Sequence, residues 1–168
     1  MSALVRGDAW QPQLGSGLWR VWYGECCDAL LAYDRVGATL PEGALRHQVA
    51  GLRDGMLPLL ERARSLAELG AHLDPAGPVR DPDLLEALAA DPIGDLSGGL
   101  GPPPTGLLRD TLLDLRDRLR EVADDAARLA LRTRENPATT DLAEWLEGLA
   151  AGIAAARKAG WIPVAYER

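Results

Sequence analysis

The 168-residue sequence contains no phenylalanine, very little lysine and only two histidines. Its single lysine is Lys158, so arginine carries nearly all of the positive charge. A formal net charge of -7 without a clustered basic segment argues against binding to nucleic acid, because phosphates are neutralised by gathered Lys and Arg side chains. The sequence also lacks an apolar run of about 20 residues, so we expect no membrane partner.

The motifs of common metal and phosphate sites are missing as well. The chain has no Glu-x-x-His pair, no zinc-ligand spacing and no nucleophile elbow. Residues 98–101 are rich in glycine, but no strand pattern precedes them and no lysine follows them, as a phosphate-binding loop would require. We therefore expect no cofactor and no metal, and the sequence favours a non-catalytic protein over an enzyme.

The two cysteines, Cys26 and Cys27, are adjacent. Neighbours on a helix point about 100° apart, so a disulfide between them would distort the helix. We predict two reduced thiols and a cytoplasmic protein, since no leader-like segment is evident either. A redox switch or soft-metal site is the alternative, but Glu25 and Asp28 would raise the pKa of the thiols, and at least one thiol is expected in the core.

What the sequence does contain is a helix with a narrow apolar stripe between Gly106 and Arg134. The apolar residues recur at alternating steps of four and three, which is typical of a helix that packs against partner helices. On its polar side, Asp114–Arg118 and Asp124–Arg128 are spaced to pair one turn apart. The stripe consists of Leu108, Leu112, Leu115, Leu119, Val122, Ala126 and Leu129.

Two stretches in the first half of the chain carry matching apolar stripes. One predicted helix runs from 17 to 36, with Ser16 as its N-cap and Gly37 as its stop. The next runs from 41 to 69, begins at a capping box in 39–42 and stops at Gly70. Pro58 interrupts this second helix and predicts a kink there, with a break into two helices as the alternative.

A last helix is predicted to begin at Thr140 or Asp141 and to run to about Ala159, and Asp141 and Glu144 have capping-box spacing. The four predicted helices, of about 20, 29, 29 and 19 residues, form two antiparallel hairpins. The predicted fold is therefore all-α, a four-helix antiparallel bundle in one domain spanning residues 1–168. Because the long helices outrun the short ones, apolar surface remains for a homodimer contact.

Three segments lie outside these helices. Residues 1–16 read as an irregular N-terminal arm, and residues 161–168 as an apolar tail that packs on the bundle. Residues 71–106 form a long Pro/Gly-rich crossover with one short helix at 81–88, because 13 of these 36 residues are Gly or Pro. Within it we predict that residues 89–106 are the most mobile part and dock through three apolar side chains, Ile93, Leu96 and Leu100.

His47 supports one sharp alternative. It falls on the side of its predicted helix away from the apolar stripe, and the string His47-Gln-Val-Ala-Gly51 resembles the phosphoacceptor region of histidine phosphotransfer domains, which are also four-helix bundles. The resemblance covers about five residues and implies that His47 accepts a phosphoryl group. Ala50 departs from the pattern, since that family usually carries lysine at this place.

The aromatic residues support a binding interpretation. If the first and last helices are adjacent, Trp19, Trp22, Tyr23, Trp145 and Trp161 build one aromatic end, either as core or as a partner-binding patch. We therefore expect a non-catalytic interaction or regulatory module that binds a protein partner or associates with itself. The alternatives are phosphotransfer at His47 and a bundle with an aromatic pocket for a small apolar ligand.

Overall fold

A computed structural model describes residues 17–74, 104–136 and 141–159. The described residues form helices and short connections, without a strand. The predictions for the arm at 1–16, the short helix at 81–88, the docking segment up to residue 103 and the tail at 161–168 lie outside these ranges. The helices are α1 (Leu18–Thr39), α2 (Ala44–Asp54), α3 (Leu57–Leu73), α5 (Pro104–Glu135) and α6 (Leu142–Ala159).

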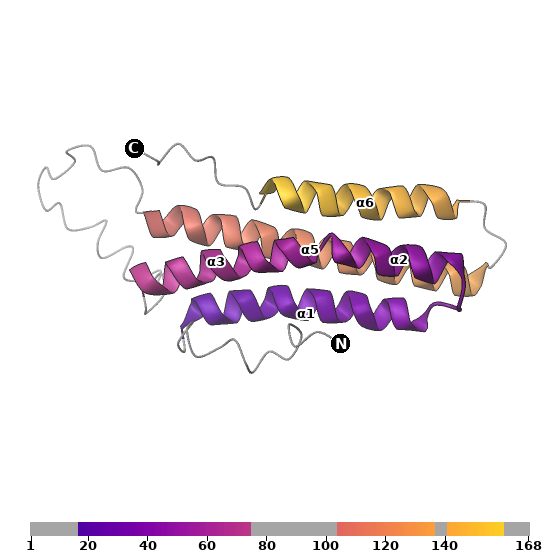
Figure 1. The fold of residues 1–168 in the computed structure, drawn as a ribbon, viewed down its shortest axis with the longest axis horizontal. Coiled ribbons are helices and arrows are strands. Elements are labelled where there is room, and N and C mark those ends of the chain that lie inside the picture. Colours follow the sequence, from indigo (N-terminus) through magenta and orange to yellow (C-terminus); the bar gives the residue numbers. More distant parts are fainter. Residues whose placement is uncertain (1–16, 75–103, 137–140, 160–168) are drawn as a thin grey trace, which may run out of the picture.

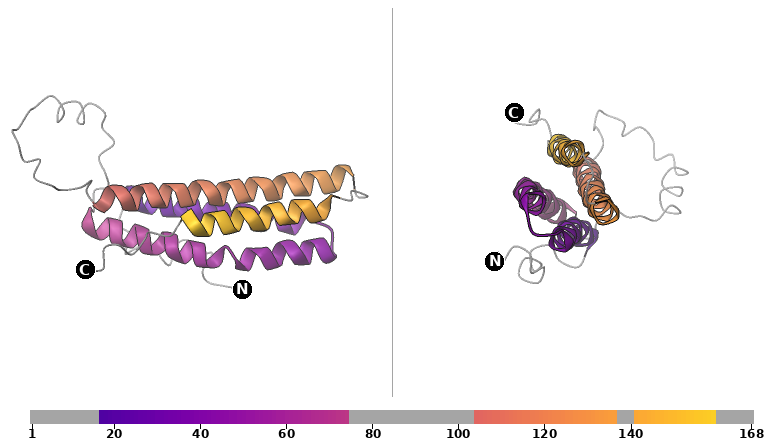
Figure 2. Two further views of the ribbon diagram at one scale, coloured as in Figure 1. Left: turned by 90° about the horizontal axis from the view of Figure 1, so that it is seen from above. Right: turned by 90° about the vertical axis from the view of Figure 1, so that its right-hand side faces the viewer.

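These helices form a bundle of four rods, because α2 and α3 run end to end (Figure 1). Each rod is antiparallel to the one before it in the chain, and the end-on view in Figure 2 shows the rods gathered around one interior. The predicted all-helical bundle is confirmed. The end of α3 and the start of α5 lie at the same end of the bundle, so the connection between them does not have to cross it.

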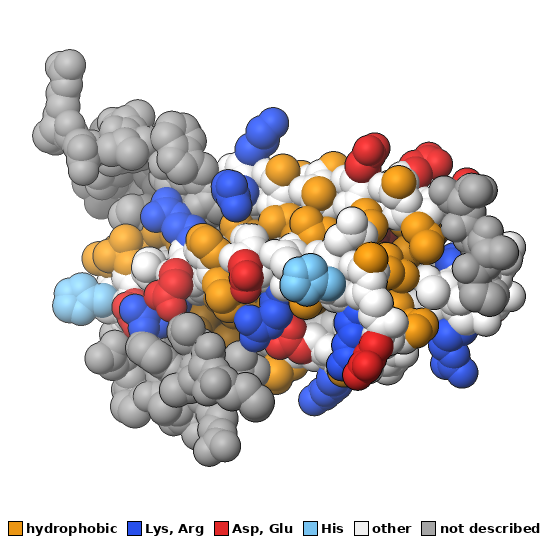
Figure 3. Space-filling view, turned by 45° about the vertical axis from the view of Figure 1, so that its right-hand side comes forward, with side chains coloured by type: hydrophobic (Ala, Val, Ile, Leu, Met, Phe, Trp, Pro, Cys, Tyr) orange, Lys and Arg blue, Asp and Glu red, His pale blue; other side chains and the backbone are white. Residues whose placement is uncertain are grey.

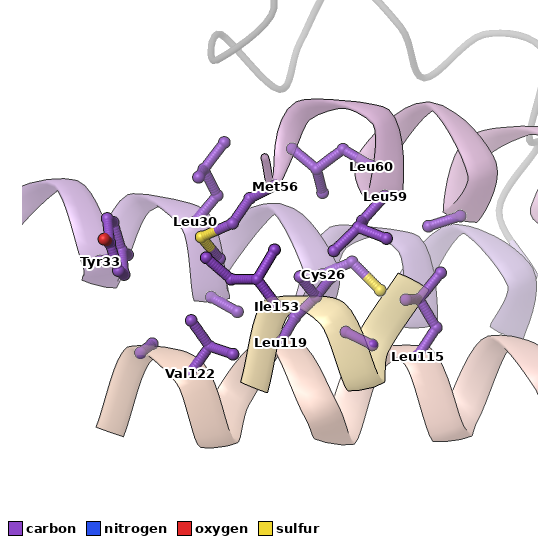
Figure 4. Packing of buried hydrophobic residues seen from close by; sticks show 14 of the residues in the cluster. Cys26, Leu30, Tyr33, Met56, Leu59, Leu60, Leu115, Leu119, Val122 and Ile153 are labelled. Atoms are coloured by element: carbon purple, nitrogen blue, oxygen red, sulfur yellow. The ribbon is translucent and has the colours of Figure 1, made fainter. Parts of the chain in front are cut away.

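The core follows the stripe of α5, the longest helix. All seven predicted stripe residues are buried, which confirms that prediction. α5 packs against α1, α3 and α6, so its stripe is covered from three sides. Figure 4 shows Leu115 and Leu119 of α5 directed into the same interior as Cys26, Met56 and Ile153 from the other rods.

Polar contacts fix α1 against α5 and α2. Glu25 accepts from Arg116 of α5 at 2.9 Å and also pairs with Arg120 at 3.2 Å. On its other side, the buried Tyr33 hydroxyl donates to the Val49 carbonyl at 2.7 Å. These bonds set the rotation of α1, whereas the apolar stripes supply most of the stabilisation, because partly exposed ion pairs contribute little.

The predicted helix starts and stops in the first half are wrong in detail. α1 continues past Gly37, which does not adopt the positive φ of a glycine stop. The predicted capping box at 39–42 does not form, since Thr39 Oγ1 donates back to Val36 and the N-cap of α2 is Gly43. Gly43 has φ +152°, a conformation that L side chains rarely adopt, so the turn requires glycine here.

The interruption near Pro58 is a break, not the kink that the phase of the stripe favoured. α2 ends at Asp54, and α3 begins at Leu57 with Pro58 in its first turn, where the missing N–H is tolerated. Gly55 and the next residue keep right-handed helical dihedrals, so the stripe stays in phase from α2 into α3.

Two further local predictions are also corrected. Gly70 does not end α3, which runs on to Leu73. On the polar side of α5, Arg128 pairs with Asp125 at 2.9 Å in place of Asp124, because i,i+3 neighbours are as close as i,i+4 neighbours on a helix.

Candidate interaction surface

Three half-exposed leucines mark one end of the bundle. Leu69 and Leu73 on α3 are 48% and 50% exposed, and Leu107 on α5 is 43% exposed. Leu69 and Leu73 are four residues apart, so they lie on the same face of α3. We call the surface formed by these three leucines the open face. Figure 3 shows hydrophobic side chains at the surface between charged ones on the side of the bundle that carries α2 and α3.

The helical phase of α5 directs Leu107 toward the side on which α6 lies. Leu107 precedes Asp125 by about five full turns, so the two side chains project in the same direction. Asp125 lines a hollow of about 310 Å³ together with Trp145 and Leu149 of α6. Leu107 therefore points to the α6 side of α5, beyond the part that α6 covers.

The phase of α3 gives the same direction for Leu73. Leu73 follows Gly55 by about five full turns, and the helical dihedrals at the break keep this relation. A Cβ at Gly55 would lie 3.3 Å from Cγ2 of Ile153 on α6. Leu73 therefore also points to the side of the bundle on which α6 lies.

The open face exists because α6 ends before α5 and α3 do (Figure 1). A Cβ at Gly152 of α6 would lie 3.1 Å from Val122, which aligns these two antiparallel helices. Ala159, the last residue of α6, is about two turns further on and is therefore level with Leu115. The start of α5 extends about 16 Å beyond that level at ~1.5 Å per residue.

The two sides of the open face are level with each other. From the approach of Ile153 to Gly55, the end of α6 is also level with Glu61 of α3. Leu69 lies about 12 Å beyond Glu61, and Leu107 lies about 12 Å beyond the end of α6 along α5. The apolar side chains of α3 and α5 therefore form one surface, positioned where a longer α6 would have packed.

Two hollows lie between α2 and α6, away from the open face. One of about 230 Å³ is lined by Gly51, Leu52 and Ala154 among others, and one of about 380 Å³ by Leu45, Gln48, Leu142 and neighbouring residues. At the first of these hollows, small side chains on both helices, among them Gly55 and Ala150, do not fill the distance between the rods.

The predicted aromatic end does not form as one unit. Trp19 and Trp22 are buried, with ring centroids 5.3 Å apart in an edge-to-face arrangement, and Tyr23 is buried beside them. Trp145 lies at the other end of the bundle, where Arg132 stacks over its ring at 5.6 Å. The expectation that the two aromatic groups meet is wrong for these four residues, and Trp161 lies outside the described residues.

The remaining predicted site residues are one histidine and two cysteines, and their exposure differs. The His47 side chain is exposed on α2, as its phase predicted. Cys26 is fully buried and Cys27 is half-buried, and both are free thiols. Burial raises the pKa of Cys26 to about 12 and also raises that of Cys27, so the expected direction is confirmed while burial, not the flanking carboxylates, is its main cause.

Within residues 17–74, 104–136 and 141–159, no three His, Cys, Asp or Glu side chains gather as a metal site would require. None of the helices in these ranges is long and apolar enough to span a membrane. Comparison of the chain with protein-family models, with curated proteins and with solved structures gives no match.

Nothing in the sequence pattern alone pointed to the open face. In the sequence, each of its three leucines is a single apolar residue next to a predicted stripe. The sequence feature that bears on this face is the difference in length between the helices. The homodimer expectation used that difference without assigning it to a place on the bundle. Locating the face required knowing which helix is level with which.

Proposed function

We propose that the protein is a non-catalytic interaction module that binds an apolar segment of a partner protein on the open face. The observation that supports this proposal is the position of Leu69, Leu73 and Leu107, which are about half exposed on one surface between two packed helices. Contiguous apolar surface of this kind marks interaction sites in soluble proteins. The rigid helices on both sides hold it in place before a partner arrives, which lowers the entropy cost of binding.

Site-specific photo-crosslinking tests this proposal. With benzoylphenylalanine in place of Leu73, illumination in an extract of the source cells is expected to capture one partner protein. The same amino acid in place of Leu131 is the matched control, because Leu131 is 54% exposed on α5 but lies near the opposite end of that helix. Capture from both positions, or from neither, would contradict the proposal.

The captured partner is then purified and titrated against two variants of the chain. Leu107→Asp is expected to weaken binding at least about tenfold, since a carboxylate would lose its hydration in an apolar contact. Leu131→Asp is expected to change the dissociation constant less than about twofold. Equal effects of the two substitutions would show that the partner binds elsewhere.

A second candidate function is phosphoryl transfer through His47. It is supported by the exposure of the His47 side chain on a bundle helix and by the open space beside Gly51, one turn later, where a Cβ would meet no atom within 4 Å. Incubation with a low-molecular-weight phosphodonor is expected to label the chain at His47, and His47→Ala to remove the label. Labelling that survives in His47→Ala would exclude this candidate.

A further inference from the structure

We propose that residues 160–168 dock on the open face of their own chain and there compete with the partner. This inference rests on the proposed function, because it concerns the regulation of the same surface. The segment reads Gly-Trp-Ile-Pro-Val-Ala-Tyr-Glu-Arg and follows α6 directly. Residues 161–166 carry no charge and include five apolar side chains besides proline.

The position of α6 delivers this segment to the open face. α6 runs toward that end of the bundle, and its last residue is level with Leu115, about 12 Å before Leu107. An extended chain advances about 3.3 Å per residue, so Ile162 reaches about 10 Å beyond Ala159 and Val164 about 16 Å. In this conformation the two residues would span the length of α5 that α6 leaves uncovered.

The spacing of the apolar residues in the segment matches that of the leucines. Proline at 163 disfavours a continued helix and biases Ile162 toward an extended conformation. In an extended chain Ile162, Val164 and Tyr166 project to the same side at steps of about 6.6 Å. Leu69 and Leu73 are separated by about 6 Å along α3, so successive side chains on the two surfaces can alternate.

Covalent attachment makes the segment an effective competitor. A short flexible tether gives a bound segment an effective concentration in the millimolar range. A partner that binds the same surface has to displace the segment first, and its apparent affinity falls accordingly. The strength of the cis contact would therefore set the concentration at which the partner binds.

Photo-crosslinking within the full chain tests the cis contact. Benzoylphenylalanine in place of Val164, which in an extended chain would lie about level with Leu73, is expected in the monomer to crosslink to a peptide containing Leu69–Leu73 or Leu107. Adding Leu107→Asp should lower the yield at least about fivefold, whereas the matched Leu131→Asp should leave it unchanged. No intramolecular crosslink, or crosslinks only to other helices, would overturn the proposal.

The competition is tested with the same capture experiment that tests the proposed function. In a chain with Ile162→Ser and Val164→Ser, capture of the partner through benzoylphenylalanine at position 73 is expected to rise at least about threefold. Unchanged or lower capture would overturn the competitive role. If no partner is captured with or without these substitutions, the proposed function is refuted, and the competition with it. The intramolecular crosslink would still decide whether the segment contacts the open face of its own chain.

Discussion

Gly70→Ala is expected to destabilise the protein by about 2 kcal/mol, because the added methyl group has no room. A Cβ at Gly70 would lie 2.5 Å from the ring of Trp19, far inside van der Waals contact. The ring has little freedom to move away. It is fully buried, packs edge-to-face on Trp22, and its Nε1 donates to the Asp74 carbonyl at 3.0 Å. The better helix propensity of alanine, about 1 kcal/mol, offsets only part of the cost.

Urea-induced unfolding measures this effect, and Gly51→Ala provides the matched control. Gly51 is a helical glycine with no neighbour within 4 Å of a Cβ, so its replacement is expected to stabilise the protein by about 0.5–1 kcal/mol. In a Trp19→Leu background most of the Gly70→Ala penalty should disappear, since the clashing ring is gone. A Gly70→Ala protein as stable as the wild type would show that Trp19 does not pack against α3 in this way.

Leu119→Ala is expected to cost about 3 kcal/mol or more in the free energy of unfolding. Leu119 is fully buried in the middle of the α5 stripe, where α1, α3 and α6 all contribute side chains to the surrounding core. Three rigid rods cannot close around the vacated volume, so a cavity remains and its lining loses contacts.

Leu131→Ala on the same helix is the control for this prediction. Leu131 is 54% exposed, so its truncation is expected to change the stability by less than about 0.5 kcal/mol. Both variants remove the same atoms and have the same helix propensity change, which leaves burial as the difference. Similar losses for the two variants, measured by thermal and urea unfolding, would contradict the central position of Leu119.

The stripe of α5 could be predicted from the sequence because it depends on spacing alone. Its seven residues repeat at the period of a helix, and no property of the rest of the chain changes which side they share. The break near Pro58 was harder to predict. Proline destabilises a helix little in its first turn and strongly in its interior, and the local sequence does not show which position Pro58 takes.

The glycines show why other features could not be predicted. A glycine near the end of an apolar stripe is typical of a helix stop, yet Gly37 and Gly70 both lie inside helices. At Gly70 the Trp19 ring packs against α3. Whether such a glycine ends a helix or makes room for a neighbouring side chain depends on the helix that packs against it. For the same reason the open face was not foreseen, since it depends on where α6 ends relative to α3 and α5. The aromatic residues on α1 and α6 could not be assigned to opposite ends without the direction of each rod.

The contact between α1 and α5 has a consequence during synthesis. α1 makes its most extensive contact with α5, which follows it only after α2, α3 and a connection of about thirty residues. At ~5–20 residues per second, the ribosome needs roughly 5–20 s to proceed from the end of α1 to the end of α5. During that interval α1, α2 and α3 can pair with one another, but the sides of α1 and α3 that α5 covers stay in water. The nascent chain therefore passes through a stage with an apolar surface that chaperones bind and that favours aggregation.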